Sequence, residues 1–82
     1  MKELKYVLSG NLRRKVLTNL LIPNTPTQLA KKLKGDRSSV SRVLLYLQEK
    51  GLVKCINDKD RVGRIYTLTD KGKKVYDVLE KM

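Results

Sequence analysis

The chain has 82 residues, with 19 Lys and Arg against 8 Asp and Glu, which gives a formal net charge of +11 at pH 7. A chain this short forms one small domain with a modest core and little room for a deep enzyme pocket. One cysteine and no histidine exclude a tetrahedral zinc site and a His-activated nucleophile, so we expect no enzyme, cofactor or metal centre.

The basic excess favours a polyanionic partner, with nucleic acid ahead of an acidic membrane surface. The longest apolar runs fall far short of the roughly 20 residues that a membrane-spanning helix needs, so we expect no membrane partner. A single cysteine cannot form an intramolecular disulfide, which is typical of a cytoplasmic protein.

Two helical patterns precede the first proline. Residues 2–8 place apolar side chains at helical spacing, which favours a short leading helix or an extended arm. A turn at residues 9–11 separates them from an amphipathic helix that starts at Leu12. We expect this helix to run to Pro23, because the residue before a proline is driven out of the helical region.

Residues 26–50 have the pattern of two short helices joined by a tight turn. Thr25 stands three residues before Gln28, which is the spacing of a capping box at a helix start. We expect Gly35 to take the left-handed conformation that ends this first helix. Asp36 then has the chemistry to cap the second.

The second of these helices has two opposite faces. Val40, Val43, Leu44 and Leu47 share helical spacing and must face the core. The other face carries hydroxyl and basic side chains and no acidic residue, whereas an ordinary solvated helix more often carries Glu and Lys pairs. Arg can donate two hydrogen bonds to guanine, and Ser allows close approach to base edges. The predicted DNA contacts on this recognition helix are Arg37, Ser38, Ser39, Ser41, Arg42 and Tyr46.

A set of phosphate contacts is predicted on the preceding helix. Its N-terminus offers free backbone N–H groups to an anion, and its surface adds positive charge. These candidates are Thr25, Thr27, Gln28, Lys31 and Lys32.

Residues 52–56 and 63–68 read as two strands of a β-hairpin with a polar, flexible tip. Basic residues on such a ribbon can contact the DNA backbone or enter the minor groove. Asp58 and Asp60 oppose this contact unless they pair with neighbouring Lys or Arg. The wing candidates, in order of preference, are Arg61, Arg64 and Lys59.

Thr69 begins a last helix, whose apolar side is predicted to hold Val75, Tyr76, Leu79 and Met82. The first and last helices carry more apolar residues than so small a core needs. We therefore expect them to pair two subunits in a homodimer.

The ordered combination of these motifs resembles the winged helix-turn-helix transcriptional regulators, including small archaeal ones and the arsenical-resistance and multiple-antibiotic-resistance repressors. The matching stretches are residues 29–33, 39–53 and 63–72. The resemblance implies an α-α-α-β-β-α order, a short extra strand near residues 23–25, and a recognition helix over about residues 37–50 that lies in the major groove.

The sequence thus predicts an α+β, mainly α fold: a winged helix-turn-helix with a three-helix core, a β-hairpin wing and a C-terminal helix. Residues 1–82 form one domain, with the helix-turn-helix at about 26–50, the wing at about 52–68 and the last helix at about 69–81. The predicted function is a sequence-specific regulator that binds double-stranded DNA. The alternative is a winged-helix protein–protein module within a larger nucleic-acid-processing assembly.

Overall fold

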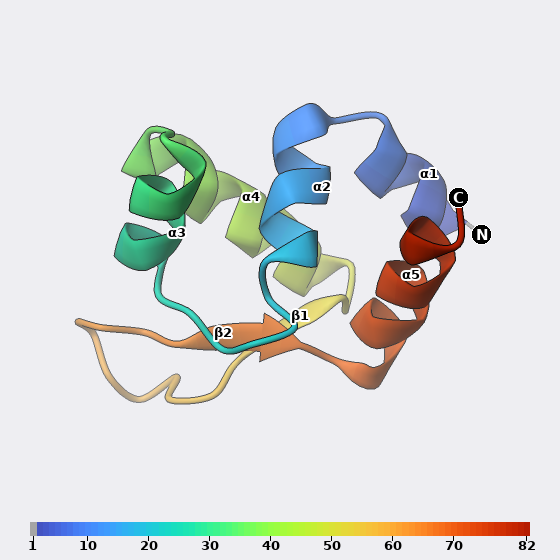
Figure 1. Ribbon diagram of the computed structural model, residues 1–82. Helices are drawn as coiled ribbons and strands as arrows, with labels where there is room; N and C mark the ends of the chain where they lie inside the picture. The colour runs from blue at the N-terminus through green and yellow to red at the C-terminus, as the bar shows by residue number, and fades with distance from the viewer. Residues whose placement is uncertain (1) are drawn as a thin grey trace.

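The computed structural model describes residues 2–82. Within them, helices gather above a two-stranded antiparallel sheet whose long connector reaches out beneath α3, while α1 and α5 lie at the opposite end (Figure 1). The predicted class, mainly helical with a hairpin wing, is confirmed. The elements are α1 (Lys2–Leu8), α2 (Asn11–Thr18), α3 (Pro26–Leu33), α4 (Arg37–Glu49), β1 (Val53–Cys55), β2 (Tyr66–Leu68) and α5 (Asp70–Glu80).

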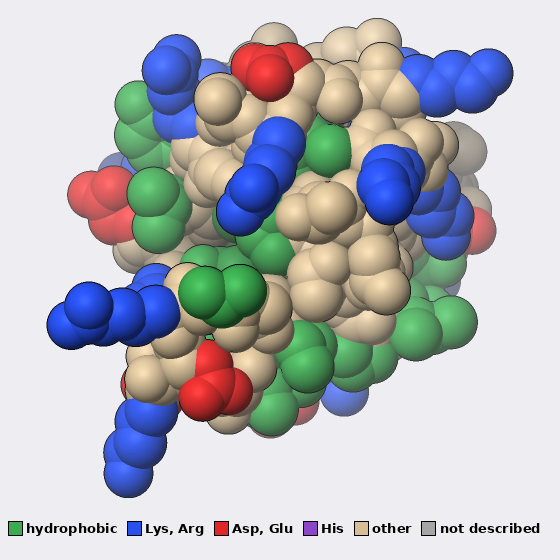
Figure 2. All heavy atoms as spheres, turned by 90° about the vertical axis from the view of Figure 1, so that its left-hand side faces the viewer, with side chains coloured by type: hydrophobic (Ala, Val, Ile, Leu, Met, Phe, Trp, Pro, Cys, Tyr) green, Lys and Arg blue, Asp and Glu red, His purple; other side chains and the backbone are tan. Residues whose placement is uncertain are grey.

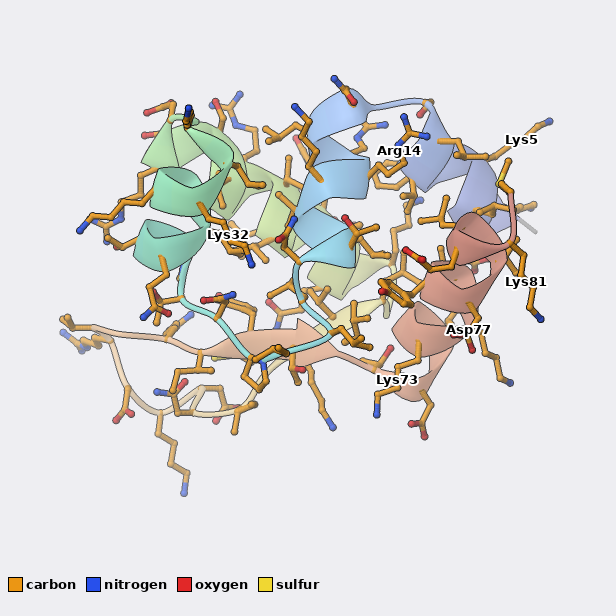
Figure 3. The ribbon with its side chains drawn as sticks, viewed as in Figure 1. Lys5, Arg14, Lys32, Lys73, Asp77 and Lys81 are labelled. Atoms are coloured by element: carbon orange, nitrogen blue, oxygen red, sulfur yellow. The ribbon has the colours of Figure 1, made fainter. Side chains whose placement is uncertain are left out.

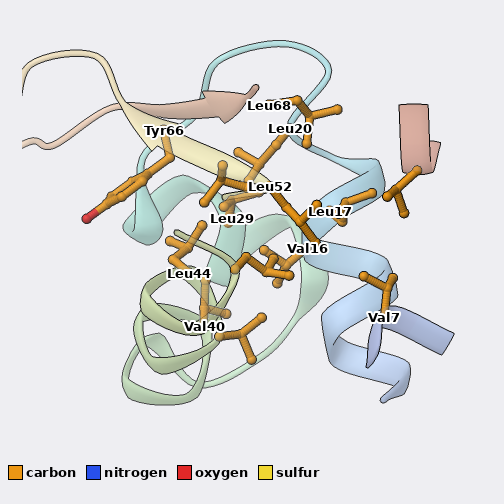
Figure 4. Packing of buried hydrophobic residues seen from close by; sticks show 14 of the residues in the cluster. Val7, Val16, Leu17, Leu20, Leu29, Val40, Leu44, Leu52, Tyr66 and Leu68 are labelled. Carbon is orange, nitrogen blue, oxygen red and sulfur yellow. The ribbon is translucent and has the colours of Figure 1, made fainter. Parts of the chain in front are cut away.

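One apolar core joins all seven of these elements (Figure 4). The predicted stripe of α4, from Val40 to Leu47, is buried as expected. Tyr66 and Leu68 of β2 are also buried and close the core from the side of the sheet. Because its stripe is held there, α4 must present its other face outward.

The predicted helix starts are confirmed by their hydrogen bonds. Thr25 Oγ1 accepts from Gln28 N at 3.1 Å, and Gln28 Oε1 accepts from Thr25 N at 3.3 Å, so the capping box of α3 is complete. Asp36 caps α4 by accepting from Ser39 N at 3.3 Å. Thr69 caps α5 through Gly72 N at 3.0 Å. These interactions span three residues each, which is why the sequence alone reveals them.

The end of α2 was predicted wrongly. The helix stops at Thr18, well before Pro23. The Leu20 carbonyl accepts from Leu68 N and from Thr67 Oγ1, both at 3.2 Å, so it is committed to the sheet. The last carbonyls of a helix have no donor within it, and here the chain after Thr18 leaves the helical path to reach β2. The prediction missed this contact with the sheet.

The turn between α3 and α4 also differs from the prediction. The left-handed residue is Lys34, with φ 53° and ψ 39°, and Gly35 lies outside that region. Gly35 N donates to the Ala30 carbonyl at 2.9 Å, and Lys34 N donates to the Lys31 carbonyl at 3.3 Å. This pair of bonds is a Schellman motif, which places the left-handed conformation one residue before the glycine.

The strands are shorter than predicted, with Val53, Lys54 and Cys55 paired to Leu68, Thr67 and Tyr66. One further bond, from Ile56 N to the Ile65 carbonyl at 2.8 Å, extends the ladder. Asn24 exchanges two backbone hydrogen bonds with Tyr66, which is the short extra strand that the resemblance implied.

At the C-terminal end, Met82 lies beyond α5 and is 76% exposed, so its predicted place on the apolar side of that helix is wrong. In residues 2–82, none of the helices has the length and apolar character needed to cross a membrane.

Candidate nucleic-acid interface

A cleft of about 590 Å³ separates α4 from the connector of the hairpin. Three segments far apart in the sequence meet there: the start of α3, the outer face of α4 and the tip of the wing. The lining residues are Thr25, Pro26, Thr27, Arg37, Ser41, Leu44, Leu45, Arg61, Val62, Gly63, Arg64 and Tyr66. Predicted contacts from all three groups thus share one concave surface, with three arginines on its walls.

The outward face of α4 carries most of the predicted recognition residues. Ser38 and Arg42 are exposed, and Tyr46 is 45% exposed. Leu45, which could touch a thymine methyl, is 57% exposed on the same face. Ser39 differs from them, because its hydroxyl donates to Asp36 Oδ2 at 3.2 Å and so belongs to the helix cap.

The capping box occupies part of the predicted phosphate site on α3. Thr25 and Gln28 use their side-chain oxygens as acceptors within the box, which leaves the hydroxyl proton and the amide N–H₂ as donors for an external anion. Thr27 and Lys31 are exposed. Lys32, by contrast, lines a second cleft with Leu21, Ile22 and Tyr76, apart from the first one.

The tip of the wing is more ordered than its polar sequence suggested. The side chain of Asn57 bonds to several residues across the connector, and Arg64 Nε donates to the Asp60 carbonyl at 2.9 Å. Lys59 and Arg61 are exposed. Asn57 is not among the predicted site residues, because its only signal in the sequence is an Asn at the start of a polar turn.

The acidic residues of the wing do not neutralise its arginines. Across residues 2–82 the structure gives one ion pair, Glu3 with Lys71 at 2.7 Å, far from the cleft. Asp60 accepts instead from the neutral amide of Asn57 at 3.0 Å. The positive charge of Arg61 and Arg64 is therefore available to an external anion.

Positive charge gathers around this end of the molecule but also extends elsewhere. In the view of Figure 2, Lys and Arg side chains project around the face that holds α3 and the wing, and they outnumber Asp and Glu. Figure 3 shows further basic residues on another side, with Asp77 among them: Lys5, Arg14, Lys32, Lys73 and Lys81. Net charge by itself thus does not locate the interface.

Over the described chain, no three His, Cys, Asp or Glu side chains gather where they could hold a metal ion.

Neither a family model nor a curated protein matches the sequence. Solved structures do match. A ZitR mutant from Lactococcus lactis has a TM-score of 0.78 at 26% identity, over 88% of this chain and 51% of that one. The reduced form of MarR from E. coli has a TM-score of 0.78 at 26% identity, over 94% and 61%. For a MepR mutant from S. aureus the values are 0.80 and 22%, over 98% and 62%.

The chain spans about half the length of the ZitR structure, at 51%, and less than two thirds of the other two. A solved structure described as a MarR family transcription regulator matches as well, with a TM-score of 0.76 at 25% identity. By its fold, the chain is a winged helix-turn-helix domain similar to those of the MarR-family transcription regulators.

Proposed function

We propose that residues 1–82 form a single winged-helix domain that binds double-stranded DNA and regulates transcription in a sequence-specific way. In this proposal α4 lies in the major groove, and the wing contacts the backbone or the minor groove. The observation that carries it is the cleft in which Arg37 and Ser41 of α4 face Arg61 and Arg64 of the wing. The similarity to MarR-family regulators supports the same function.

Each group of residues has a distinct role in this proposal. Arg42 and its serine neighbours on α4 read base edges, since Arg can bond guanine O6 and N7 together. The start of α3 receives a phosphate at Thr25, Thr27 and Gln28 with charge from Lys31, and the wing supplies Arg61, Arg64 and Lys59. Lys32 contributes to the general positive field. The chain acts by binding, without catalysis or a cofactor, and we place it in the cytoplasm.

We further propose that the regulator works as a homodimer. The pairing surface would lie at the end formed by α1 and α5, where Leu8 and Met82 remain exposed. Val7 of α1 is fully buried in the subunit core and is not available to this surface. A two-fold dimer of this kind binds half-sites roughly 34–36 Å apart.

Selection of bound duplexes from a random library, with the full chain at a low and a high salt concentration, tests the proposal. We expect one enriched motif, repeated in two half-sites if the chain is a dimer. The logarithm of the binding constant should fall with the logarithm of salt concentration by roughly 0.9 per neutralised phosphate. Weak binding with no enriched motif and no salt dependence would overturn the proposal in favour of a protein–protein module.

A further inference from the structure

We propose that Asn57 is the positioning residue of the wing. It holds the connector between β1 and β2 in the shape that brings Arg61 and Arg64 to the cleft beside α4. This inference rests on the proposed DNA-binding function and names the residue that prepares the wing for it.

Both ends of the Asn57 amide are used, and they reach both sides of the connector. Oδ1 accepts from Ile65 N at 2.7 Å and from Cys55 Sγ at 3.6 Å. Nδ2 donates to the Gly63 carbonyl at 3.1 Å and to Asp60 Oδ2 at 3.0 Å. One half-buried side chain thus links the end of β1 to Gly63 and Ile65, where the chain comes back toward β2.

The backbone hydrogen bonds between the strands do not hold the connector in this shape. Their ladder ends with the bond from Ile56 N to the Ile65 carbonyl. Beyond that pair the connector depends on side chains, apart from the bond of Asp60 N to the Asn57 carbonyl at 3.0 Å. Gly63 adopts a φ of 71°, a conformation that a side chain would strain, and its carbonyl meets the Asn57 amide there.

Asn57 and Arg64 both bond to Asp60 in the middle of the connector. Asn57 Nδ2 donates to one oxygen of the Asp60 carboxylate, Oδ2, and Arg64 Nε donates to the Asp60 carbonyl. Through Asp60, the Asn57 amide is thus linked to the segment that carries Arg64. Asparagine suits the position because its side chain combines a donor pair with an acceptor.

A double-mutant cycle separates positioning from simple stabilisation. Affinities for a duplex obtained by selection are measured for the full-length wild type, Asn57→Ala, Arg61→Ala and the double variant, at a temperature where all are folded. We expect Asn57→Ala to weaken binding roughly tenfold. Arg61→Ala should also reduce the affinity for the duplex by a smaller factor in the Asn57→Ala background than in the wild type. We expect the two factors to differ at least about threefold, because a misplaced arginine contributes less to binding. Asn11→Ala, the same change at an exposed site of α2, should bind like the wild type.

Independent effects would overturn the inference, since Asn57 would then serve stability alone. It also fails if neither Arg61→Ala nor Arg64→Ala weakens binding by the wild type, because no wing contact then exists to be positioned. The major-groove contact is judged separately, by Arg42→Ala, so failure here is distinguishable from failure of the proposed function.

Asn57→Asp keeps the inference testable if the alanine variant does not fold. The aspartate retains the acceptor for Ile65 N but sets a carboxylate against Asp60. Like charges that share a site raise the pKa of one of them, and the protonated carboxyl can then donate to the other. We expect the affinity loss relative to wild type to shrink as the pH is lowered toward about 5. A loss of affinity that is the same at neutral pH and at about pH 5 would contradict the positioning role.

Discussion

Arg42 stands on the exposed face of α4, one helical turn before Tyr46, while the residues behind it are buried in the core. The core therefore fixes the direction in which Arg42 points, without any contact to the arginine itself. A side chain presented in this way is free to form a bidentate bond with a base.

Arg42→Ala is expected to relax base preference at one position of the operator. The loss of discrimination should be about 1–3 kcal/mol, the value of one bidentate Arg–guanine contact. Competition titrations with duplexes that vary at each position measure it. Arg14→Ala is the matched control, since Arg14 is exposed on another side of the molecule (Figure 3), and its base preference should stay that of the wild type. Unchanged affinity and preference in Arg42→Ala would show that α4 is not the recognition helix.

Lys34 and Gly35, at the end of α3, are expected to tolerate reciprocal exchanges: a glycine at position 34 and a side chain at position 35. A residue other than glycine costs roughly 1–2 kcal/mol in the left-handed conformation. We expect Lys34→Gly to raise the free energy of unfolding by about 1 kcal/mol, measured in urea. Gly35→Ala should be neutral or stabilising by about 0.4–1 kcal/mol, because an added Cβ would meet only Val40 Cγ2, at 4.0 Å. Destabilisation by Gly35→Ala would place the left-handed residue at the glycine after all.

At the scale of elements, α5 packs unusually close to the chain that follows α4. Gly72 is buried in the first turn of α5, and Thr69 Oγ1 donates to the Gly51 carbonyl at 2.6 Å nearby. A Cβ at Gly72 would lie 2.0 Å from the Leu52 carbonyl oxygen and 3.0 Å from its carbon. The glycine thus allows the helix to meet the backbone directly.

Gly72→Ala should therefore destabilise the fold, although alanine favours a helix. The clash is with backbone, which cannot rotate away, so α5 must shift, and overpacking of this kind costs about 1–3 kcal/mol. The intrinsic gain from Gly to Ala in a helix is about 1 kcal/mol or less. Urea unfolding measures the net change in the free energy of unfolding. Gly35→Ala is the control, because a Cβ at Gly35 would have only Val40 Cγ2 near it, at 4.0 Å. Equal or greater stability in Gly72→Ala would contradict this packing.

For the molecule as a whole, polar contacts tie the first helix to the rest. Glu3 pairs with Lys71 of α5, and the Tyr6 ring has Arg13 at 4.1 Å and Lys50 at 5.2 Å from its centre. The hydrogen bond from Lys71 is the main cause that lowers the pKa of Glu3 from its ordinary value of 4.5. Acid should therefore loosen this end of the protein.

The direction of the pH effect follows from that lowered pKa. A carboxyl group whose pKa is lower in the folded state stabilises the fold above its unfolded pKa and stops doing so as the pH falls through the folded value. Glu3→Gln should consequently lose less stability than the wild type between pH 7 and about pH 3. Urea unfolding of both proteins at the two pH values tests this. Parallel losses would show that the pair is too exposed to matter.

The features that were predicted correctly from the sequence depend on residues that lie close together in the chain. The capping box of α3, the side-chain caps of α4 and α5, the buried stripe of α4 and its outward Ser and Arg face depend on residues three or four positions apart. Even so, the turn at Lys34 shows that two neighbouring residues can exchange roles when the helix ends with a Schellman motif.

Residues close together in the chain are enough to predict where the capped helices begin, which face of α4 enters the core, and how large the positive charge is. Tertiary structure alone decided that α2 stops at Thr18, because the partners of Leu20 lie 47 and 48 positions away on β2. It also decided that Arg37 meets Arg61 across a cleft while Lys32 lines another, and that Asn57 organises the wing. Short-range patterns record bonds within one turn of chain, whereas these features depend on which distant segments the core brings together.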